Sequence, residues 1–358
     1  LEMLPDIDFG PGIAELMTDF SKAANRAVNW NVLGVNGAPN DPNKAARQLA
    51  VTDFARENGG EILALTVPST PKIYINLFSG FIFDANPGMW REIFKWPVAE
   101  RIEKLRDPAL RATLKADLTT VSPDAGMYFA TQFQNYSIAS VKSPNNEKYQ
   151  DRLISDIAAE EGKHPVDVVF DIAIEDGLTT SFMPNLGGNE KAAFALRGEL
   201  WKDDRTLIGA SDAGAHLDMI DTFAFSTDVL QRGVREYQVI SLEEAIYQMT
   251  DRLARYMGLI DRGLLTPGYF ADIVVFDAET VGKGETYFRY DVPGDQFRTY
   301  AEASGIDHVF VNGVQIVRNG EHTGKLPGTV LRSGKDTRTV ALDALREGRT
   351  AELVSEPA

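Results

Sequence analysis

The chain has 358 residues, of which 44% are hydrophobic, enough for one large domain with an appendage or for two domains. Its formal net charge of −16 argues against binding to nucleic acid or to an anionic membrane surface, since both are negatively charged. The absence of cysteine excludes disulfides, thiolate nucleophiles and cysteine-ligated metals, and no apolar run is long enough for a transmembrane helix. We therefore expect an acidic, cytoplasmic protein that acts on a small molecule.

The first 67 residues alternate between helix and strand patterns. Apolar residues at helical spacing predict a helix over 11–25 and a second one over 42–57, which is closed by two glycines. Residues 27–33 and 61–67 read as strands, because they are short, nearly continuous apolar runs. Short connections between such elements predict a parallel sheet that is covered by helices.

A long insertion, about residues 69–204, then interrupts this alternation. We predict helices over 97–116 and 145–162 and a third one that begins at His164–Pro165. The first part of the insertion is rich in aromatic residues, which are Tyr74, Phe78, Phe81, Phe83, Trp90, Phe94 and Trp96. Long insertions of this kind can build substrate sites, but aromatic residues in a long loop more often pack the loop down.

The C-terminal third changes character. Ser241 to Glu244 form a capping box, which predicts the start of a helix that ends near Gly258. Residues 266–333 contain short β runs, two of them separated by Asn312–Gly313, the strongest short hairpin signal. We predict a small β-sandwich unit there, and a polar, partly mobile tail over 334–358.

Asp212 is the main candidate for chemistry. The strand expected over 206–211 stops at Ser211–Asp212, and a carboxylate at the carboxyl end of a buried parallel strand is where barrel enzymes place catalytic groups. The alternative is that Asp212 caps the next helix or turn. His216 either contacts substrate near Asp212 or bonds to the backbone of its loop, and Ser211 is a candidate substrate contact rather than a nucleophile.

The other histidines give little support for a metal site made by this chain alone. The chain has only four, and none forms an HxH or HExxH pair. We expect His164, His308 and His322 to be structural or solvated. Asn29 and Asn31 could instead line the mouth of a barrel as polar side chains.

Two segments resemble a known family. They are residues 209–216 (GASDAGAH) and residues 263–277 (GLLTPGYFADIVVFD), the second followed by 309–313 (VFVNG). In this order they resemble the C-terminal part of the amidohydrolase superfamily, and most closely its D-aminoacylase, or N-acyl-D-amino-acid deacylase, branch.

The resemblance implies a (β/α)₈ barrel of the TIM type with a small β-sandwich, of which residues 1–265 would form part of the barrel. It implies a metal-dependent hydrolase that cleaves the amide C–N bond of an N-acyl amino acid or a similar small molecule. Asp212 matches the aspartate of the last barrel strand, which lies at the metal, takes a proton from the metal-bound water and passes it to the leaving amine. The cofactor would be a divalent metal, usually zinc, with most of its ligands upstream of Leu1.

The sequence also departs from the family pattern. The HxH pair and the histidine that ends the sixth barrel strand are missing, and the segment 213–230 has no arginine to hold a substrate carboxylate, the first one being Arg232. Three barrel strands would leave open edges, so we expect the chain to pair with an N-terminal half or to form a homo-oligomer. The alternative function is accordingly a non-catalytic or degenerate piece of an amidohydrolase.

Overall fold

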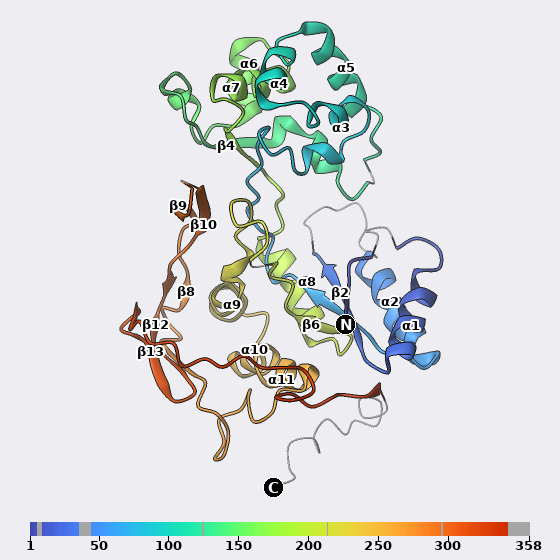
Figure 1. The fold of residues 1–358 in the computed structure, drawn as a ribbon, viewed down its shortest axis with the longest axis vertical. Coiled ribbons are helices and arrows are strands. Elements are labelled where there is room, and N and C mark those ends of the chain that lie inside the picture. The colour runs from blue at the N-terminus through green and yellow to red at the C-terminus, as the bar shows by residue number, and fades with distance from the viewer. Residues whose placement is uncertain (6–8, 36–43, 124, 213, 295, 343–358) are drawn as a thin grey trace.

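The computed structural model of the protein describes residues 1–5, 9–35, 44–123, 125–212, 214–294 and 296–342. Figure 1 shows three parts: a helical insertion at the top, a parallel sheet with its helices at the right, and a unit of antiparallel strands at the left. Among the described residues, no helix has the length and apolar character needed to cross a membrane.

A parallel sheet of four strands is the base of the α/β part. Its order is β1-β2-β3-β6, with strands β1 (Glu2–Met3), β2 (Val28–Leu33), β3 (Ile62–Thr66) and β6 (Thr206–Ile208). The three strands expected from the apolar runs are confirmed, each shorter than predicted. Strand β1 is an additional edge strand, which is too short to give a recognisable apolar pattern in the sequence. Most of the apolar side chains of these strands are buried, as expected for a sheet covered by helices, whereas Val32 of β2 is exposed.

Three helices connect and cover these strands, which are α1 (Ile13–Ala24), α2 (Lys44–Glu57) and α8 (Lys191–Lys202). The apolar faces of α1 and α2 meet the sheet in a buried core that includes Met17, Trp30, Leu49 and Ile62. The predicted α/β character is thus confirmed. Closure of the sheet into a (β/α)₈ barrel and the β-sandwich remain predictions, because the described strands form an open four-stranded parallel sheet, a separate four-stranded antiparallel sheet and isolated antiparallel pairs.

The insertion between β3 and α8 consists of short elements around a core of its own. They are η1 (Phe83–Ala85), α3 (Met89–Ile93), α4 (Val98–Lys104), α5 (Pro108–Leu118), η2 (Tyr128–Thr131), η3 (Phe133–Asn135), β4 (Tyr136–Ser140), η4 (Pro144–Tyr149), α6 (Ile154–Glu161), α7 (Pro165–Glu175) and β5 (Ser181–Pro184). Helix α8 follows the insertion and packs on β6 rather than on the core of the insertion. It therefore continues the alternation of helices and strands in the α/β part.

Two of the helices expected in the insertion are each divided in two. Pro108 opens α5 with the Asp107 side chain as its N-cap, and a proline within a continuous helix would clash with the preceding turn. The helix expected over 145–162 is a 3₁₀ segment, η4, followed by α6, and Asp151 between them has a positive φ of 62°. Single-helix predictions over these ranges were wrong because an apolar stripe persists across both breaks.

The aromatic residues of the insertion mostly build its core. The ring of Phe133 stacks on Phe83 at 5.5 Å and on Trp90 at 5.4 Å, and Trp90 stacks on Phe170 at 5.8 Å. The indole nitrogen of Trp90 donates to the Leu114 carbonyl at 3.0 Å, so its polar group is satisfied inside the core. This confirms that most of these aromatics pack the insertion rather than bind a ligand.

The C-terminal unit contains eight short strands, in a four-stranded sheet of order β14-β13-β12-β7 and two antiparallel pairs, β9 with β10 and β8 with β11. Their bounds are β7 (Ile273–Phe276), β8 (Gly282–Lys283), β9 (Tyr287–Val292), β10 (Gln296–Tyr300), β11 (Ala303–Ser304), β12 (Ile306–Val311), β13 (Val314–Arg318) and β14 (Glu321–His322). The predicted hairpin is confirmed: Asn312 and Gly313 have φ values of 48° and 76° between β12 and β13, as a type I′ turn requires.

Short helices join β6 to this unit: η5 (Thr222–Ala224), α9 (Phe225–Asp228), the π-helical η6 (Val229–Glu236), α10 (Leu242–Met249) and α11 (Asp251–Met257). The Ser241 side chain accepts from the Glu244 amide, which confirms the predicted start of α10. The predicted single helix is broken at Thr250, whose hydroxyl donates to the Ile246 carbonyl.

The first part of the predicted tail packs onto the body of the protein. The Arg338 amide donates to the Gly258 carbonyl at 2.7 Å, and Val340 and Leu342 are buried. The remainder of the tail, residues 343–358, lies outside the described residues.

Replacement of Phe133 by alanine should destabilise the insertion strongly. The side chain is buried and contacts three aromatic rings, so a loss of about 3–5 kcal/mol in unfolding free energy is expected from the lost burial and the resulting cavity. Urea unfolding followed by circular dichroism measures this change. The matched control is Leu196→Ala at an exposed position of α8, with an expected change of about 0.5 kcal/mol or less. Equal effects of the two substitutions would contradict this description of the core.

Candidate functional site

Strand β6 brings the chain to the candidate site. Leu207 and Ile208 are buried, and their residues pair in parallel register with Leu65 and Thr66 of β3. The ladder continues one step further, since the Gly209 amide donates to the Thr66 carbonyl at 3.2 Å. The chain then leaves the sheet at its carboxyl edge, so Asp212 lies where the sequence pattern predicts.

The Asp212 carboxylate is accessible to solvent. Its side chain is 48% exposed, and its backbone has a positive φ of 50°, which aspartate tolerates better than most residues. No helix begins in the described residues directly after it, because the next helical segment starts at Thr222. A helix cap, one form of the structural alternative for Asp212, is therefore not seen in these described residues. The other form, a turn, is present, because the Ala215 amide donates to the Asp212 carbonyl at 3.2 Å.

His216 lies beside Asp212. Its Nε2 is 3.8 Å from the Asp212 Oδ2, and its ring stacks on that of Phe81 at 4.7 Å with an angle of 27° between the planes. The His216 carbonyl accepts from the amides of Met219 and Ile220, so its backbone is held in a turn while its ring faces the carboxylate. The structure thus brings together the two residues that the sequence places four apart.

Ser211 helps to close the loop that carries these residues. Its backbone carbonyl accepts a hydrogen bond from the Thr222 hydroxyl, which joins the two ends of the segment from Ser211 to Thr222. We call this segment the site loop. The His216 imidazole faces Asp212, an arrangement that supports acid–base chemistry at Asp212 better than a serine nucleophile.

A buried carboxylate anchors the far end of the site loop. Asp221 is 3% exposed and accepts from the Lys72 amide at 2.8 Å, from the Thr286 hydroxyl at 2.8 Å and from the Lys283 ammonium at 2.5 Å. These donors come from the entry of the insertion and from the C-terminal unit. Burial, with the Asp221 charge as a smaller cause, raises the pKa of Tyr74 to about 12.

Two further contacts fix the loop backbone. The buried Thr299 hydroxyl of β10 donates to the carbonyls of Leu217 and Ile220, at 2.9 and 2.7 Å. On the other side, the segment that enters the insertion runs antiparallel to the loop, and the Tyr74 amide donates to the Met219 carbonyl at 2.7 Å. The Asp212 and His216 positions are therefore supported by parts of the chain far apart in sequence.

Arg197 of α8 forms hydrogen bonds to the segments that follow β2 and β3 and to the segment that precedes α8. Its buried guanidinium donates to the carbonyls of Gly188 and Val35, at 2.5 and 2.7 Å, and to the Thr70 hydroxyl at 2.9 Å. Burial among these neutral acceptors lowers the pKa of Arg197 to about 10, which still leaves it charged at neutral pH.

Arg232, the first arginine after Asp212, is already paired. Its guanidinium binds the buried carboxylate of Asp228, one turn earlier in the same helical stretch. Removing this arginine to bind a substrate carboxylate would leave Asp228 buried without its partner. The structure therefore supplies no substitute here for the arginine that the family pattern places after the aspartate.

The remaining candidates have structural contacts. His164 is the N-cap of α7, with its Nδ1 accepting from the Val166 amide, and His308 Nδ1 lies 3.2 Å from the Gln315 amide nitrogen. His322 is exposed in β14. The buried Asn29 side chain bonds to Glu2 and to the Tyr256 hydroxyl near the start of β2, and Asn31 is half-buried.

The described residues do not provide a complete metal site. They contain no group of three or more histidine, aspartate or glutamate side chains arranged to hold an ion. Asp212 and His216 are close enough to contribute two ligands, whereas a zinc site in a protein usually has three or four. The described part of the chain therefore does not by itself fit the metal that the resemblance implies.

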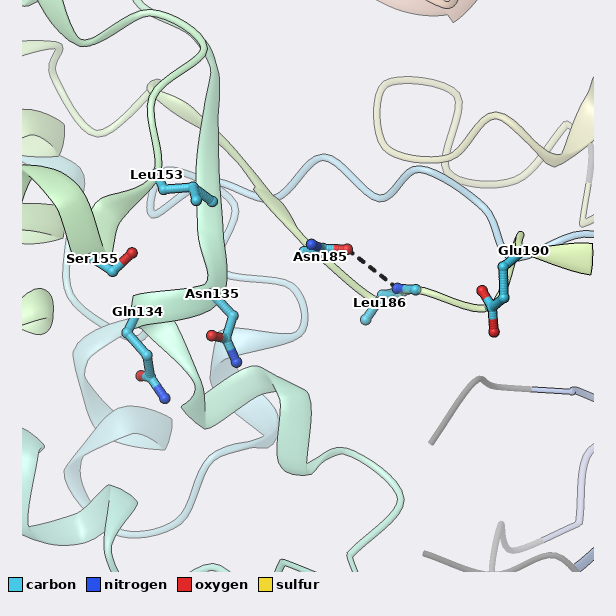
Figure 2. Close-up of a pocket in the computed structure, with 9 residues that line it drawn as sticks. Gln134, Asn135, Leu153, Ser155, Asn185, Leu186 and Glu190 are labelled. Carbon is cyan, nitrogen blue, oxygen red and sulfur yellow. Dashed lines mark hydrogen bonds between the residues drawn. The ribbon is translucent and has the colours of Figure 1, made fainter. Parts of the chain in front are cut away.

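A pocket of about 470 Å³ lies between the insertion and the segment leading to α8, and none of Ser211, Asp212 and His216 lines it (Figure 2). Its lining residues are Gln134, Asn135, Leu153, Ser155, Asn185, Leu186, Gly187, Gly188 and Glu190. Figure 2 shows that the Asn185 side chain turns toward the Gly187 amide, which donates to it at 3.3 Å. With a single carboxylate and no histidine or lysine, the pocket lacks an acid–base pair.

Sequence reasoning found Asp212 and His216 but missed Asp221, Lys283 and the Phe81 stacking partner. Asp221 was visible only as one more carboxylate of an acidic loop. Phe81 was one of seven aromatics, and no local pattern separates it from those that form the core.

Comparison with known proteins gives the family. The model of the amidohydrolase family matches residues 15–317, more than half of the chain. The chain is 42% identical over 122 residues to the N-acyl-D-glutamate deacylase of Alcaligenes xylosoxydans xylosoxydans, covering 34% of this chain and 22% of that protein. It is 32% identical over 184 residues to the D-aminoacylase of the same organism, covering 50% of this chain and 34% of that protein. The matched part is thus well under two thirds of the length of either relative.

Solved structures resemble the chain at lower identity. A D-aminoacylase crystal structure is 21% identical with a TM-score of 0.48, covering 89% of this chain and 53% of that one. The N-acyl-D-glutamate deacylase from Bordetella bronchiseptica, complexed with zinc and a phosphonate inhibitor, is 20% identical with a TM-score of 0.43, covering 86% and 50%. The resemblance seen in the two sequence segments is confirmed by the family match over residues 15–317: the chain belongs to the amidohydrolase family, in its D-aminoacylase-like branch.

Proposed function

We propose that the protein is a hydrolase that cleaves the amide C–N bond of an N-acyl amino acid or a similar small molecule, with Asp212 as the residue that transfers the proton. One observation carries this proposal: a solvent-accessible carboxylate at the carboxyl end of β6 lies 3.8 Å from a histidine in a chain of the amidohydrolase family. The names of the curated relatives, two N-acyl-D-amino-acid deacylases and a D-aminoacylase, support the substrate class.

Asp212 can serve as base and then as acid in this reaction. As a water oxygen attacks the amide carbon, the carboxylate takes up a proton from that water. The same proton then passes to the amide nitrogen as the C–N bond breaks, which releases a carboxylic acid and an amine. The exposure of Asp212 allows water and substrate to reach it.

His216 and Ser211 are proposed to contact the substrate. The His216 ring lies next to the carboxylate and can hydrogen-bond to a substrate oxygen. Ser211 precedes Asp212 at the same edge of the sheet and is half-buried.

A divalent metal, with zinc the favoured ion, is part of the proposal at the level of the whole protein. Solved structures that resemble the chain include a deacylase complexed with zinc and a D-aminoacylase mutant complexed with copper chloride. Among the residues that the structure describes, Asp212 and His216 are the candidate ligands, and further ligands would come from outside them.

A second function is favoured by the incomplete metal site. In this alternative the protein is a non-catalytic or degenerate member of the family, or a piece that becomes active only with another polypeptide. The observation behind it is that the described residues contain no group of three potential metal ligands. The two functions differ in metal content and in turnover, and both can be measured.

Substitution of Asp212 by asparagine should abolish most amide hydrolysis. Asparagine keeps the shape but cannot accept the proton, so we expect the rate to fall roughly a hundredfold to ten-thousandfold. The assay is release of free amine from N-acetyl-D-amino acids. The matched control is Asp218→Asn, an exposed carboxylate of the same loop, with an expected rate close to that of the unchanged protein. A full rate in Asp212→Asn would rule out this role.

Elemental analysis of the purified protein should find zinc or another divalent metal, and a chelator should remove both metal and activity. This expectation follows from the family and from the two candidate ligands Asp212 and His216. A metal-free protein without hydrolytic activity would favour the second function. A metal-free protein with full activity would exclude metal dependence.

A further inference from the structure

We propose that the side chains of Phe81 and His216 form a substrate-binding surface beside Asp212, which we call the specificity wall. This surface binds an aromatic or aliphatic group of the substrate and disfavours a group that carries a carboxylate. This inference rests on the proposed function, because it concerns the substrate of the same site. It states whether the amino acid of the substrate has an apolar or an acidic side chain, which the family match does not determine.

The wall lies within reach of the proposed reaction. The Phe81 and His216 rings are stacked at 4.7 Å, and the Nε2 of His216 is 3.8 Å from the Asp212 Oδ2. The Phe81 side chain comes from the insertion and is 46% exposed, so part of its surface is open to a ligand. A substrate whose amide lies against Asp212 therefore has adjacent groups at the stacked rings.

The loop that carries Phe81 is held firmly. The buried guanidinium of Arg101 donates to the carbonyls of Leu77 and Phe78, at 2.6 and 3.0 Å. The Asn76 side chain accepts from the amides of Phe78 and Ser79, at 3.1 and 2.8 Å. The turn that precedes Phe81 is therefore held by side-chain hydrogen bonds from Arg101 and Asn76.

The turn is also sterically confined. Gly80, which precedes Phe81, has a φ of 81°, and a Cβ atom added there would lie 2.1 Å from the Phe94 ring. Only glycine avoids this clash while keeping a conformation that side chains rarely adopt. The backbone directly before Phe81 is thus confined to this turn.

Other large apolar side chains of the same two segments are exposed as well. Phe78 is 52% exposed and Leu217, the neighbour of His216, is 47% exposed. Exposed aromatic side chains cost hydrophobic free energy unless a ligand or partner covers them. A substrate with an apolar group would remove part of this surface from water.

The charges of these segments act against an acidic group. Residues 77–82 and 209–222 together contain Asp212, Asp218 and Asp221 but no lysine or arginine. Lys283, which approaches from β8, is bound to the buried Asp221. The Asp221–Lys283 pair is neutral as a whole, so the carboxylates of Asp212 and Asp218 are the remaining charges of these two segments, and both have the same sign as a substrate carboxylate at the wall.

Binding of two matched probes tests this inference. N-acetyl-D-phenylalanine and N-acetyl-D-glutamate share the acetyl group and the α-carboxylate, so only the side chain differs. Isothermal titration calorimetry of the purified protein should show that the phenylalanine probe binds about tenfold more tightly or better, as expected for an apolar site that excludes a charge. The Phe81→Ala variant should lose most of this preference.

A second variant guards against simple misfolding. Phe81→Arg places a cation at the wall and should strengthen binding of the glutamate probe while weakening that of the phenylalanine probe, a gain that a damaged fold cannot produce. The control is Phe270→Ala, an exposed phenylalanine that stacks on Arg262 in the C-terminal unit, and it should leave both affinities unchanged.

The outcomes separate this inference from the proposed function. Tighter binding of the glutamate probe, equal binding of both probes, no binding of either, or an unchanged preference in Phe81→Ala would each overturn the specificity wall. Preferential binding of the phenylalanine probe supports it whether or not the amide is cleaved. Binding without cleavage would count against the proposed hydrolase function alone.

Discussion

The arrangement of the site depends on the ion pair and the hydrogen bonds of the buried Asp221 carboxylate. A charge that is 3% exposed has to be matched by donors, and the donors here come from the insertion and from the C-terminal unit. The described residues of the site loop form no helix and no extended strand before Thr222, and its far end is held by contacts from other parts of the chain. One ion pair with its added hydrogen bonds thereby joins all three parts of the molecule beside Asp212.

Local patterns predicted local structure well. The parallel strands were visible as apolar runs, and the β12–β13 hairpin was visible in Asn312–Gly313, because each signal acts within a few residues. The start of α10 was visible in Ser241 for the same reason. Breaks within helices were missed, since Thr250 and Pro108 interrupt a backbone without interrupting the apolar stripe that the prediction follows.

The site was only partly predictable. Asp212 could be found because the end of a buried strand is defined by its own sequence. The Asp221–Lys283 pair spans 62 residues, and nothing in the sequence of either segment states that they meet. Asn29 shows a different limit: strand alternation gives the face on which a side chain lies but not its position along the sheet. Its partners Glu2 and Tyr256 place it at the beginning of β2.

The way in which the insertion is attached has a mechanical consequence. Its entry segment is bridged on one side to the site loop, at Ile73 and Ile220, and on the other to its own exit strand β5, at Ile75 and Phe182. Entry, exit and site loop thus share one hydrogen-bonded layer, which removes the independent hinge that a freely swinging domain requires. A rotation of the insertion relative to the sheet would have to break these backbone hydrogen bonds or move the site loop as well. The position of the His216 ring is therefore coupled to the position of the insertion, on which its stacking partner Phe81 lies.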